Sequence, residues 1–352
     1  MKKYIVLFLS ISFILNACAA QANPSPMPAE IATSTQTSVS VPTSTSEPIH
    51  LKLGYQPFLS ASAIFIAEDG GYFSQQGLDV ELVRFNAGSD VLTAMISGSI
   101  DIDTENLSAG AISLVAKGSG YKFVGERGFI DPQSSCSYQD IMVRTDLLKN
   151  GFLDNPANVK GLKFATTSAS VFEYGLDLQM SKLGLKASDI QLVNMPAQPD
   201  RLAALKNGAI DGVTFSEPWV TTTKKSGAGD TWVSYEGLTP NLPLSVVLYG
   251  PRLIGNPDIG KRFMVAYLNA IRQYQQGKTD ANVAILSKYT GISPDDIKAS
   301  CWVSIAADGR THLDTWLPYE QWLVSKGYLD AVVPTNQLWD SEFVDYANSV
   351  VK

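Results

Sequence analysis

Histidine and cysteine are scarce in this sequence, and their scarcity limits the chemistry open to it. The 352 residues include two histidines, His50 and His312, and three cysteines. No C-x-x-C, H-E-x-x-H, G-x-S-x-G or phosphate-loop pattern occurs in the strand and turn context that each requires. We therefore expect a protein that is not an enzyme and that has no cofactor and no metal site.

Charge is also sparse, and its sign is negative. Charged residues make up 17% of the chain and the formal net charge is −7, which becomes −9 if the lysines at positions 2 and 3 are removed. An acidic balance disfavours a nucleic-acid partner. The apolar fraction of 45% and the length are enough for the cores of two α/β lobes.

The N-terminus has the pattern of an export signal. Two lysines precede an apolar run from Tyr4 to Leu15, which is too short for a transmembrane helix. The run ends in Leu-Asn-Ala-Cys18, which resembles the bacterial lipobox, where a lipid is attached to the cysteine. We expect residues 1–17 to be a lipoprotein signal peptide and Cys18 to carry the lipid, on the outer face of the cell membrane; an ordinary secretory signal is the alternative.

A segment of low complexity follows this signal. Residues 21–48 contain 11 Ser or Thr and 5 Pro among 28 residues, and only two charges. Such a composition buries too little apolar surface to offset the entropy of ordering. We expect residues 18–48 to be a disordered tether between the lipid and the folded part, although composition alone also allows a glycosylated stalk.

The other two cysteines, Cys136 and Cys301, leave two alternatives open. Export places them in a compartment where a disulfide persists, so they could form a bridge. Two buried, inert thiols would fit equally well, because free cysteine is often buried.

Strand and helix patterns alternate along the folded part, which predicts a mostly parallel sheet covered on both faces. The strand-like segments of the first half are residues 51–54, 79–85, 100–103 and 122–127, and the helical ones are residues 60–69, 90–96 and 109–117. The second half repeats the alternation, with strands at 163–166, 191–194 and 212–215 and helices at 170–183 and 199–206.

A local echo supports two similar halves. Ala, Gly, Ile, Asp and Thr occur at the same offsets in residues 94–104 and 204–214. The glycine can adopt the positive φ that ends a helix, the isoleucine fills a core and the aspartate opens a strand. We interpret this echo as a pseudo-repeat of two lobes.

The C-terminal third has one strong strand, residues 244–249, and then helical patterns at 261–276, 294–299 and 319–325. We expect it to pack on the first lobe, which makes that lobe discontinuous. Residues 49–142 and 247–352 would form lobe 1 and residues 143–246 lobe 2. Two crossings, near residues 140–146 and 243–250, would act as a hinge for closure around a ligand.

The chain from about residue 51 to residue 225 resembles the nitrate, sulfonate, taurine and thiamine-precursor receptors with the type II periplasmic-binding-protein fold. The matching residues include Gly71-Tyr-Phe, Gly77-Leu-Asp-Val-Glu, Gly208 with Asp211-Gly, and Glu217-Pro218. The resemblance implies a two-lobed α/β fold, a monomer that binds a small molecule, and permease and ATPase subunits of an ABC importer as partners. A thiamine-pyrimidine synthase shares this fold, but it relies on histidine and cysteine chemistry that is sparse here.

Ligands of open α/β sheets bind at the carboxyl ends of strands, where helix N-termini present free N–H groups. Four loops meet this rule, and in the resembling family the same loops hold the ligand contacts. As ligand-binding residues we therefore predict Tyr55, Gln56, Asn106, Ser108, Thr167, Ser168, Phe172, Tyr174, Glu217 and Trp219.

The four loops contain no Lys, Arg or His, and aromatic residues are frequent in and near them. Aromatic faces with amides and hydroxyls suit a flat, uncharged heterocycle. Within the resembling family this favours riboflavin first and the pyrimidine precursor of thiamine second. A small anion such as nitrate, taurine or an alkanesulfonate is the alternative.

Overall fold

The computed structural model describes residues 47–104, 106–118 and 120–351. The predicted signal peptide, Cys18 and all of the predicted tether except its last two residues lie outside this part. In the described residues, no helix has both the length and the apolarity needed to cross a membrane.

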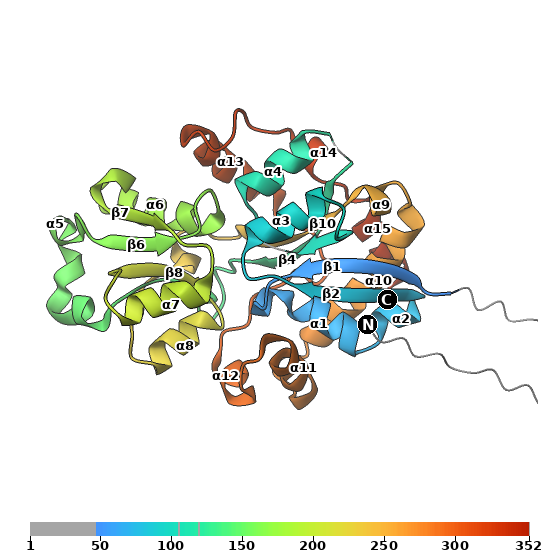
Figure 1. Ribbon diagram of the computed structural model, residues 1–352, viewed down its shortest axis with the longest axis horizontal. Coiled ribbons are helices and arrows are strands. Elements are labelled where there is room, and N and C mark those ends of the chain that lie inside the picture. Colours follow the sequence, from blue (N-terminus) through green and yellow to red (C-terminus); the bar gives the residue numbers. More distant parts are fainter. Residues whose placement is uncertain (1–46, 105, 119, 352) are drawn as a thin grey trace, which may run out of the picture. The chain divides into compact units, whose positions relative to one another are not determined.

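Two five-stranded sheets form the centre of the fold (Figure 1). The first sheet has the order β2-β1-β3-β10-β4 and the second the order β7-β6-β8-β5-β9. The strands of the first sheet are β1 (Ile49–Tyr55), β2 (Leu78–Arg84), β3 (Ile102–Thr104), β4 (Lys122–Phe129) and β10 (Pro243–Tyr249). Those of the second are β5 (Gln139–Val143), β6 (Lys163–Thr166), β7 (Gln191–Asn194), β8 (Gly212–Ser216) and β9 (Asp230–Ser234).

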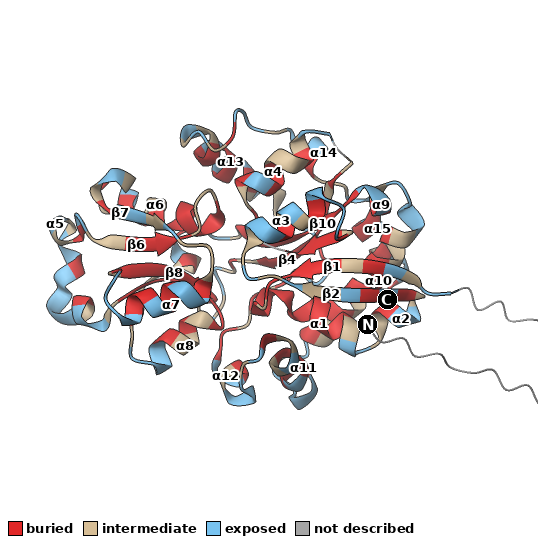
Figure 2. Ribbon diagram, viewed as in Figure 1, coloured by how far each residue is buried: buried red, intermediate tan, exposed pale blue. Residues whose placement is uncertain are grey.

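Helices cover both sheets, and buried residues concentrate in the strands (Figure 2). We call the first sheet, together with α1 (Ser62–Asp69), α2 (Tyr72–Gln75), α3 (Gly88–Ile96), α4 (Ala109–Ala116), α9 (Pro251–Ile254), α10 (Pro257–Tyr274), α14 (Thr335–Leu338) and α15 (Glu342–Val350), lobe 1. Lobe 2 is the second sheet with α5 (Pro156–Val159), α6 (Val171–Lys182), α7 (Gln198–Lys206) and α8 (Trp219–Lys225). Helices α11 (Asp280–Thr290), α12 (Pro294–Ala299) and α13 (Trp316–Ser325) complete the chain; α12 contacts α8, and α13 contacts α6.

The α/β prediction of two sheets is confirmed, but the sheets are mixed rather than mostly parallel. Strand β10 runs antiparallel to β3 and β4, and β5 runs antiparallel to β8 and β9. Each reversed strand is the one by which the chain enters a sheet from the other lobe. It therefore does not follow a crossover helix, which is the connection that keeps neighbouring strands parallel.

The chain changes sheet twice, between β4 and β5 (residues 130–138) and between β9 and β10 (residues 235–242). Both crossings precede the segments that the sequence suggested, residues 140–146 and 243–250. Those segments include most of β5 and all of β10, whose residues are buried throughout. Strand β10 was predicted at residues 244–249, but β5 was not: it is buried on both faces, so its sequence does not show the alternation that would mark it as a sheet member.

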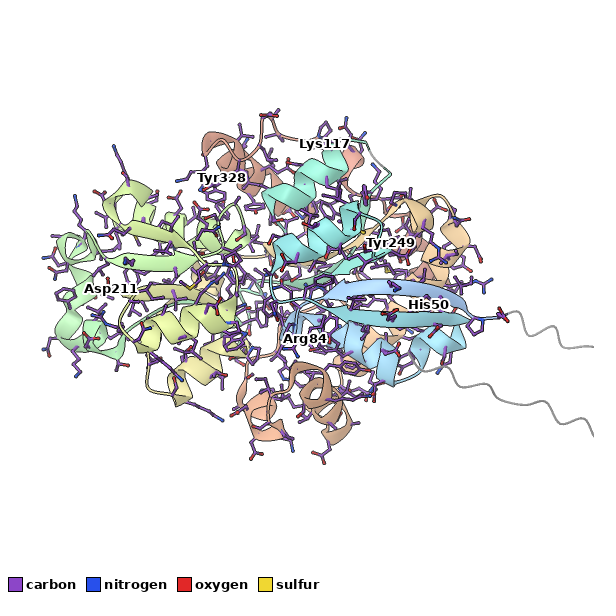
Figure 3. All side chains as sticks on the ribbon, in the orientation of Figure 1. His50, Arg84, Lys117, Asp211, Tyr249 and Tyr328 are labelled. Carbon is purple, nitrogen blue, oxygen red and sulfur yellow. A yellow bond between two sulfur atoms is a disulfide. The ribbon has the colours of Figure 1, made fainter. Side chains whose placement is uncertain are left out.

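The echoed segments form the same corner in each lobe. Gly98 and Gly208 end α3 and α7 with φ of 72° and 73°. Asp101 accepts a hydrogen bond of 2.9 Å from the N–H of Lys52, and Asp211 accepts one of 2.8 Å from the N–H of Lys163. Each aspartate also pairs with an arginine, at 3.2 Å for Asp101 and 2.7 Å for Asp211, the latter labelled in Figure 3. The pseudo-repeat thus includes side-chain contacts as well as sequence.

Cys136 and Cys301 form a disulfide, which is the first of the two alternatives for these residues. Cys136 lies in the first crossing between the sheets, and Cys301 follows α12. The bond therefore ties the crossing to the C-terminal third of the chain.

Candidate functional site

A cavity of about 220 Å³, partly open to solvent, lies between loops of the two lobes. Its walls come from the carboxyl ends of β1 and β3 in lobe 1 and of β6 and β7 in lobe 2, and from the first turns of the helices that follow. This is the place where open α/β sheets bind ligands. The lining residues are Gln56, Phe58, Gly88, Ser89, Leu92, Asn106, Ser108, Gly110, Thr167, Ser168, Ala169, Ser170, Phe172, Asn194, Pro196 and Gln198.

Four helices begin at this cavity. The first turns of α3, α4, α6 and α7 contain lining residues, respectively Gly88, Gly110, Phe172 and Gln198. A helix N-terminus carries a partial positive charge and N–H groups without an intrahelical acceptor. The helix N-termini therefore make the cavity favourable for a negatively charged group, although none of its described lining residues is charged.

The two lobes touch directly at one edge of the cavity. The N–H of Ala109 in α4 donates a hydrogen bond of 2.9 Å to the carbonyl of Ala169 before α6, and Ser108 and Ser170 form a bridge of the β type. Ser108 and Ser170 are also the N-caps of α4 and α6, since their Oγ atoms accept from the N–H groups of Ala111 and Phe172. These serines thus serve both helix capping and contact between lobes.

Amide side chains fill much of the remaining wall. Gln56 is buried and donates 3.0 Å to the carbonyl of Asn86, which leaves its Oε1 as an acceptor. Asn106 accepts 3.1 Å from the hydroxyl of Ser245, which leaves its NH₂ group as a donor. Asn194 accepts 3.0 Å from the N–H of Ser168, and Gln198 exchanges hydrogen bonds of 3.2 and 3.3 Å with Ser216. Gln56 and Asn106 in lobe 1 and Asn194 in lobe 2 therefore each keep hydrogen-bonding capacity for a ligand.

The structure brings six of the ten predicted binding residues together on this cavity. They are Gln56, Asn106, Ser108, Thr167, Ser168 and Phe172. The other four, Tyr55, Tyr174, Glu217 and Trp219, do not line it. Tyr55 packs edge-on against Phe65 with ring centroids 5.2 Å apart, and Trp219 begins α8 and packs on the apolar cluster of β8.

Tyr174 and Glu217 have partners elsewhere. The ring of Tyr174 contacts those of Tyr319 and Trp322 at 5.4 and 5.2 Å. Glu217 is buried and accepts from the N–H and hydroxyl of Thr221, at 3.0 and 2.8 Å, and from the N–H of Cys301 at 3.1 Å. Burial raises the pKa of Glu217 above its ordinary value. These bonds supply the partners that a buried carboxylate needs.

A fully buried arginine, Arg201, lies directly behind the cavity and was missed in the sequence. It is in the first half of α7 and its guanidinium donates to the hydroxyl of Thr167 and, at 3.3 Å, to the carbonyl of Pro196, both lining residues. Burial lowers its pKa to about 9. One signal could have revealed it: with Ala204 and Leu205, Arg201 follows the three- and four-residue spacing of the buried face of α7.

No group of three or more His, Cys, Asp or Glu side chains among the described residues is placed to hold a metal ion. The two histidines lie away from the cavity: His50 is in β1 and pairs with Asp79, and His312 packs against the ring of Phe129 at 4.7 Å. Both cysteines of the described part are in the disulfide. This arrangement suits binding by hydrogen bonds.

Residues 44–287 match the model of the NMT1-like family. The chain belongs to this family. Among curated relatives of this NMT1-like protein, the taurine-binding periplasmic protein of Escherichia coli K12 is 22% identical over 262 residues, which cover 72% of this chain and 76% of the relative.

Solved structures share the fold over most of their length. A ligand-binding component of an ABC-type import system from Staphylococcus aureus superposes with a TM-score of 0.72 at 19% identity, covering 85% of this chain and 99% of the other. The periplasmic nitrate-binding protein of Synechocystis PCC 6803 gives 0.72 at 16% identity, with 87% and 90% covered. The prediction of a two-lobed, type II periplasmic-binding-protein fold is thus confirmed.

Two enzymes are also similar to this NMT1-like protein. A 4-amino-5-hydroxymethyl-2-methylpyrimidine phosphate synthase of Saccharomyces cerevisiae is 28% identical over 153 residues, 42% of this chain and 41% of the synthase. The desulfurization enzyme DszB superposes with a TM-score of 0.62 at 15% identity, covering 86% of this chain and 99% of the enzyme. The fold alone therefore does not decide between binding and catalysis.

Proposed function

We propose that the chain is the substrate-binding component of an ABC importer, a monomer that captures a small molecule between its lobes and delivers it to permease and ATPase subunits. The observation that carries this proposal is the cavity between the lobes, whose walls come from strand ends of both. A guest held by two lobes that are joined by two crossings can be enclosed and released by rotation about the crossings. The taurine-binding relative and the import-system neighbour support the same role.

Binding without catalysis is part of the proposal. The cavity is lined by amides, hydroxyls and apolar groups, and neither histidine is among the lining residues. A general acid or base would have to come from a titratable side chain within reach of the ligand. The described lining residues provide none, so we expect the protein to return its ligand unchanged.

For the ligand, a small organic or inorganic anion is supported best. Four helix N-termini converge on the cavity, and the described lining residues include no carboxylate to repel negative charge. Taurine carries a sulfonate and nitrate is an anion, and proteins named for binding them are similar to this chain. A sulfonate-bearing compound is therefore our first candidate.

A flat heterocycle, with riboflavin ahead of the pyrimidine precursor of thiamine, remains the second candidate. The observation that favours it is the presence of two aromatic rings, Phe58 and Phe172, on the cavity wall. Four tyrosines in or near the four loops, Tyr55, Tyr138, Tyr174 and Tyr249, are buried in the core instead. Fewer rings thus face the ligand than the sequence suggested.

Export and lipid attachment at Cys18 belong to the same proposal. A tether of about 30 residues would let a membrane-anchored receptor reach its permease. Metabolic labelling with a radioactive fatty acid tests this step: the native chain should take up label and a Cys18→Ala variant should not. A labelled variant would contradict the lipid anchor and leave the binding role intact.

The decisive experiment is to release whatever copurifies with native protein and identify it by mass spectrometry. Thermal shift measurements with taurine, ethanesulfonate, nitrate, riboflavin and the thiamine pyrimidine then rank the candidates, because a ligand that binds only the folded state raises Tm. We expect a sulfonate to give the largest shift. A chain that releases no ligand and responds to none of the panel would contradict the receptor role.

A further inference from the structure

Arg201 is the most buried cation near the cavity, and all its hydrogen bonds go to neutral acceptors. Its side chain has no exposed surface. Nε donates 2.5 Å to the carbonyl of Met195, and one terminal nitrogen donates 2.7 Å to the carbonyl of Thr214. The other terminal nitrogen donates to the hydroxyl of Thr167 and to the carbonyl of Pro196.

The positive charge of Arg201 is not balanced by a carboxylate. No ion pair involves Arg201 anywhere in residues 47–104, 106–118 and 120–351. Arg144, in the same lobe, shows the usual arrangement: it lies 3.1 Å from Asp146 and 2.7 Å from Asp211. A buried charge without a counter-charge is costly, and proteins seldom keep one.

Two contacts connect this charge to the cavity. Thr167 and Phe172 both line the cavity, and the guanidinium carbon of Arg201 lies 5.3 Å from the centre of the Phe172 ring. Thr167 has a single hydroxyl proton. Because its oxygen accepts from Arg201, that proton is left for a different acceptor, and a group in the cavity is within its reach.

We propose that Arg201 is the specificity-determining and positioning residue of the site, which orients the Thr167 hydroxyl as a donor to the ligand and has its charge balanced by an anionic group on that ligand. This inference rests on the proposed binding function. It assigns the preference of the site for anionic ligands to one residue. Arg201 acts through Thr167, since it has no exposed atom with which to touch the ligand.

The alternative role for Arg201 is purely structural. Its bonds to the carbonyls of Met195 and Thr214 tie the middle of β8 to the loop before α7. Loss of such a tie would weaken the binding of every ligand by the same factor. Loss of a charge partner would weaken the binding of anions more than that of neutral molecules of the same shape.

The test compares ethanesulfonate with ethanesulfonamide, its neutral analogue of nearly the same shape, by isothermal titration calorimetry on the full chain. The native protein should prefer the sulfonate. Arg201→Gln and Thr167→Val should each lower the ratio of the two affinities by about tenfold, the size expected for a charge-assisted hydrogen bond. Arg201→Lys, which keeps the charge, should restore part of the ratio.

Arg144→Gln is the matched control, because it removes a cation of lobe 2 whose charge is already balanced. The ratio of its affinities for ethanesulfonate and ethanesulfonamide should equal that of the native protein. If Arg201→Gln does not fold, Thr167→Val carries the test alone, since it removes only a hydroxyl. Equal losses for both probes in the Arg201 and Thr167 variants would establish the structural role and overturn the inference.

Mass spectrometry of the natively bound ligand tests the role of Arg201 separately from the proposed receptor function. A ligand with an acid group supports the inference and then replaces ethanesulfonate as the probe. A neutral ligand, or a native protein that binds both probes equally well, overturns the role of Arg201 while the receptor function stands. Absence of any bound or binding molecule contradicts the receptor function itself.

Discussion

The hydroxyl of Tyr328, just after α13, donates a hydrogen bond of 3.0 Å to Oε1 of Glu173 in α6 (Figure 3 labels Tyr328). The other carboxylate oxygen of Glu173 accepts 2.7 Å from the N–H of Ala169, which lines the cavity. Asp177, one turn further along α6, accepts from the indole of Trp322 at 2.8 Å and from Lys326 at 3.0 Å. The C-terminal segment therefore holds the helix that carries one wall of the site.

Substitution of Tyr328 by Phe should weaken ligand binding about tenfold. The variant loses a hydrogen bond to a carboxylate that also positions the cavity loop. Burial, with Glu173 nearby, raises the pKa of Tyr328 to about 12, so the phenol is a donor throughout the physiological range. Affinity is measured by calorimetry with the ligand found on native protein. Tyr346→Phe, at an exposed position of α15, is the control, and equal affinities for both variants would contradict the prediction.

Gly175 allows the close approach of Tyr235 to α6, and Gly175→Ala should be destabilising. A Cβ at this position would lie 2.1 Å from a ring carbon of Tyr235, which is fully buried. We expect a loss of about 1–3 kcal/mol in the free energy of unfolding, the usual cost of overpacking a core. Ligand affinity should also fall, because the Tyr235 hydroxyl donates to the carbonyl of Phe172 on the cavity wall.

Gly237→Ala provides the control for Gly175→Ala, since no other atom lies within 4 Å of the added methyl carbon. Urea denaturation of the two variants measures the difference. Equal midpoints would show that the contact between α6 and Tyr235 can relax at no cost.

Glu126 should make the protein less stable as the pH rises. Burial raises its pKa from 4.5 to about 8, and one of its oxygens accepts 3.0 Å from the N–H of Ala306. Between these two values the folded chain holds a proton that the unfolded chain has released. The stability contributed by the protonated form is thus complete below about pH 4.5 and is lost as the pH rises toward 8, with a slope on the order of 1 kcal/mol per pH unit.

Glu126→Gln should remove this slope, because an amide keeps the acceptor for Ala306 but has no charge to bury. The measurement is the free energy of unfolding at intervals between pH 5 and 8. Glu47→Gln, at an exposed position, should retain the native slope. A Glu126→Gln profile as steep as the native one would assign the pH dependence to other groups.

The sequence predicted the fold best at positions where the residue type points to a single structural role. The repeated corner was marked by two kinds of residue. Gly98 and Gly208 end a helix, and Asp101 and Asp211 open the strand that follows. Strands β5 and β9 were not recognised. Strand β5 is buried at every residue and β9 is only partly buried, so neither shows a clear alternation of apolar and polar side chains.

The candidate site shows a similar limit. Three of the four loops selected by the strand-end rule line the cavity, whereas the loop with Glu217 and Trp219 does not, and the segments at the starts of α3 and α7 were not selected. The rule also does not specify which side chains on a loop face inward. Phe172 and Tyr174 are two residues apart on α6 and so point to different sides of the helix; one lines the cavity and the other packs on α13. Arg201 escaped notice because it reaches the cavity from the next helix, which only tertiary packing brings there.

The bond between Cys136 and Cys301 closes a covalent ring, since the two residues are 165 positions apart. Every strand of the second sheet lies within that ring, from β5 to β9. A protease that cuts once anywhere between the two cysteines would open the ring without releasing a fragment. The nicked protein should migrate as one species in a non-reducing gel and as two after reduction, whereas two species before reduction would disprove the linkage. The protein could thereby stay in one piece after a single break in its second lobe.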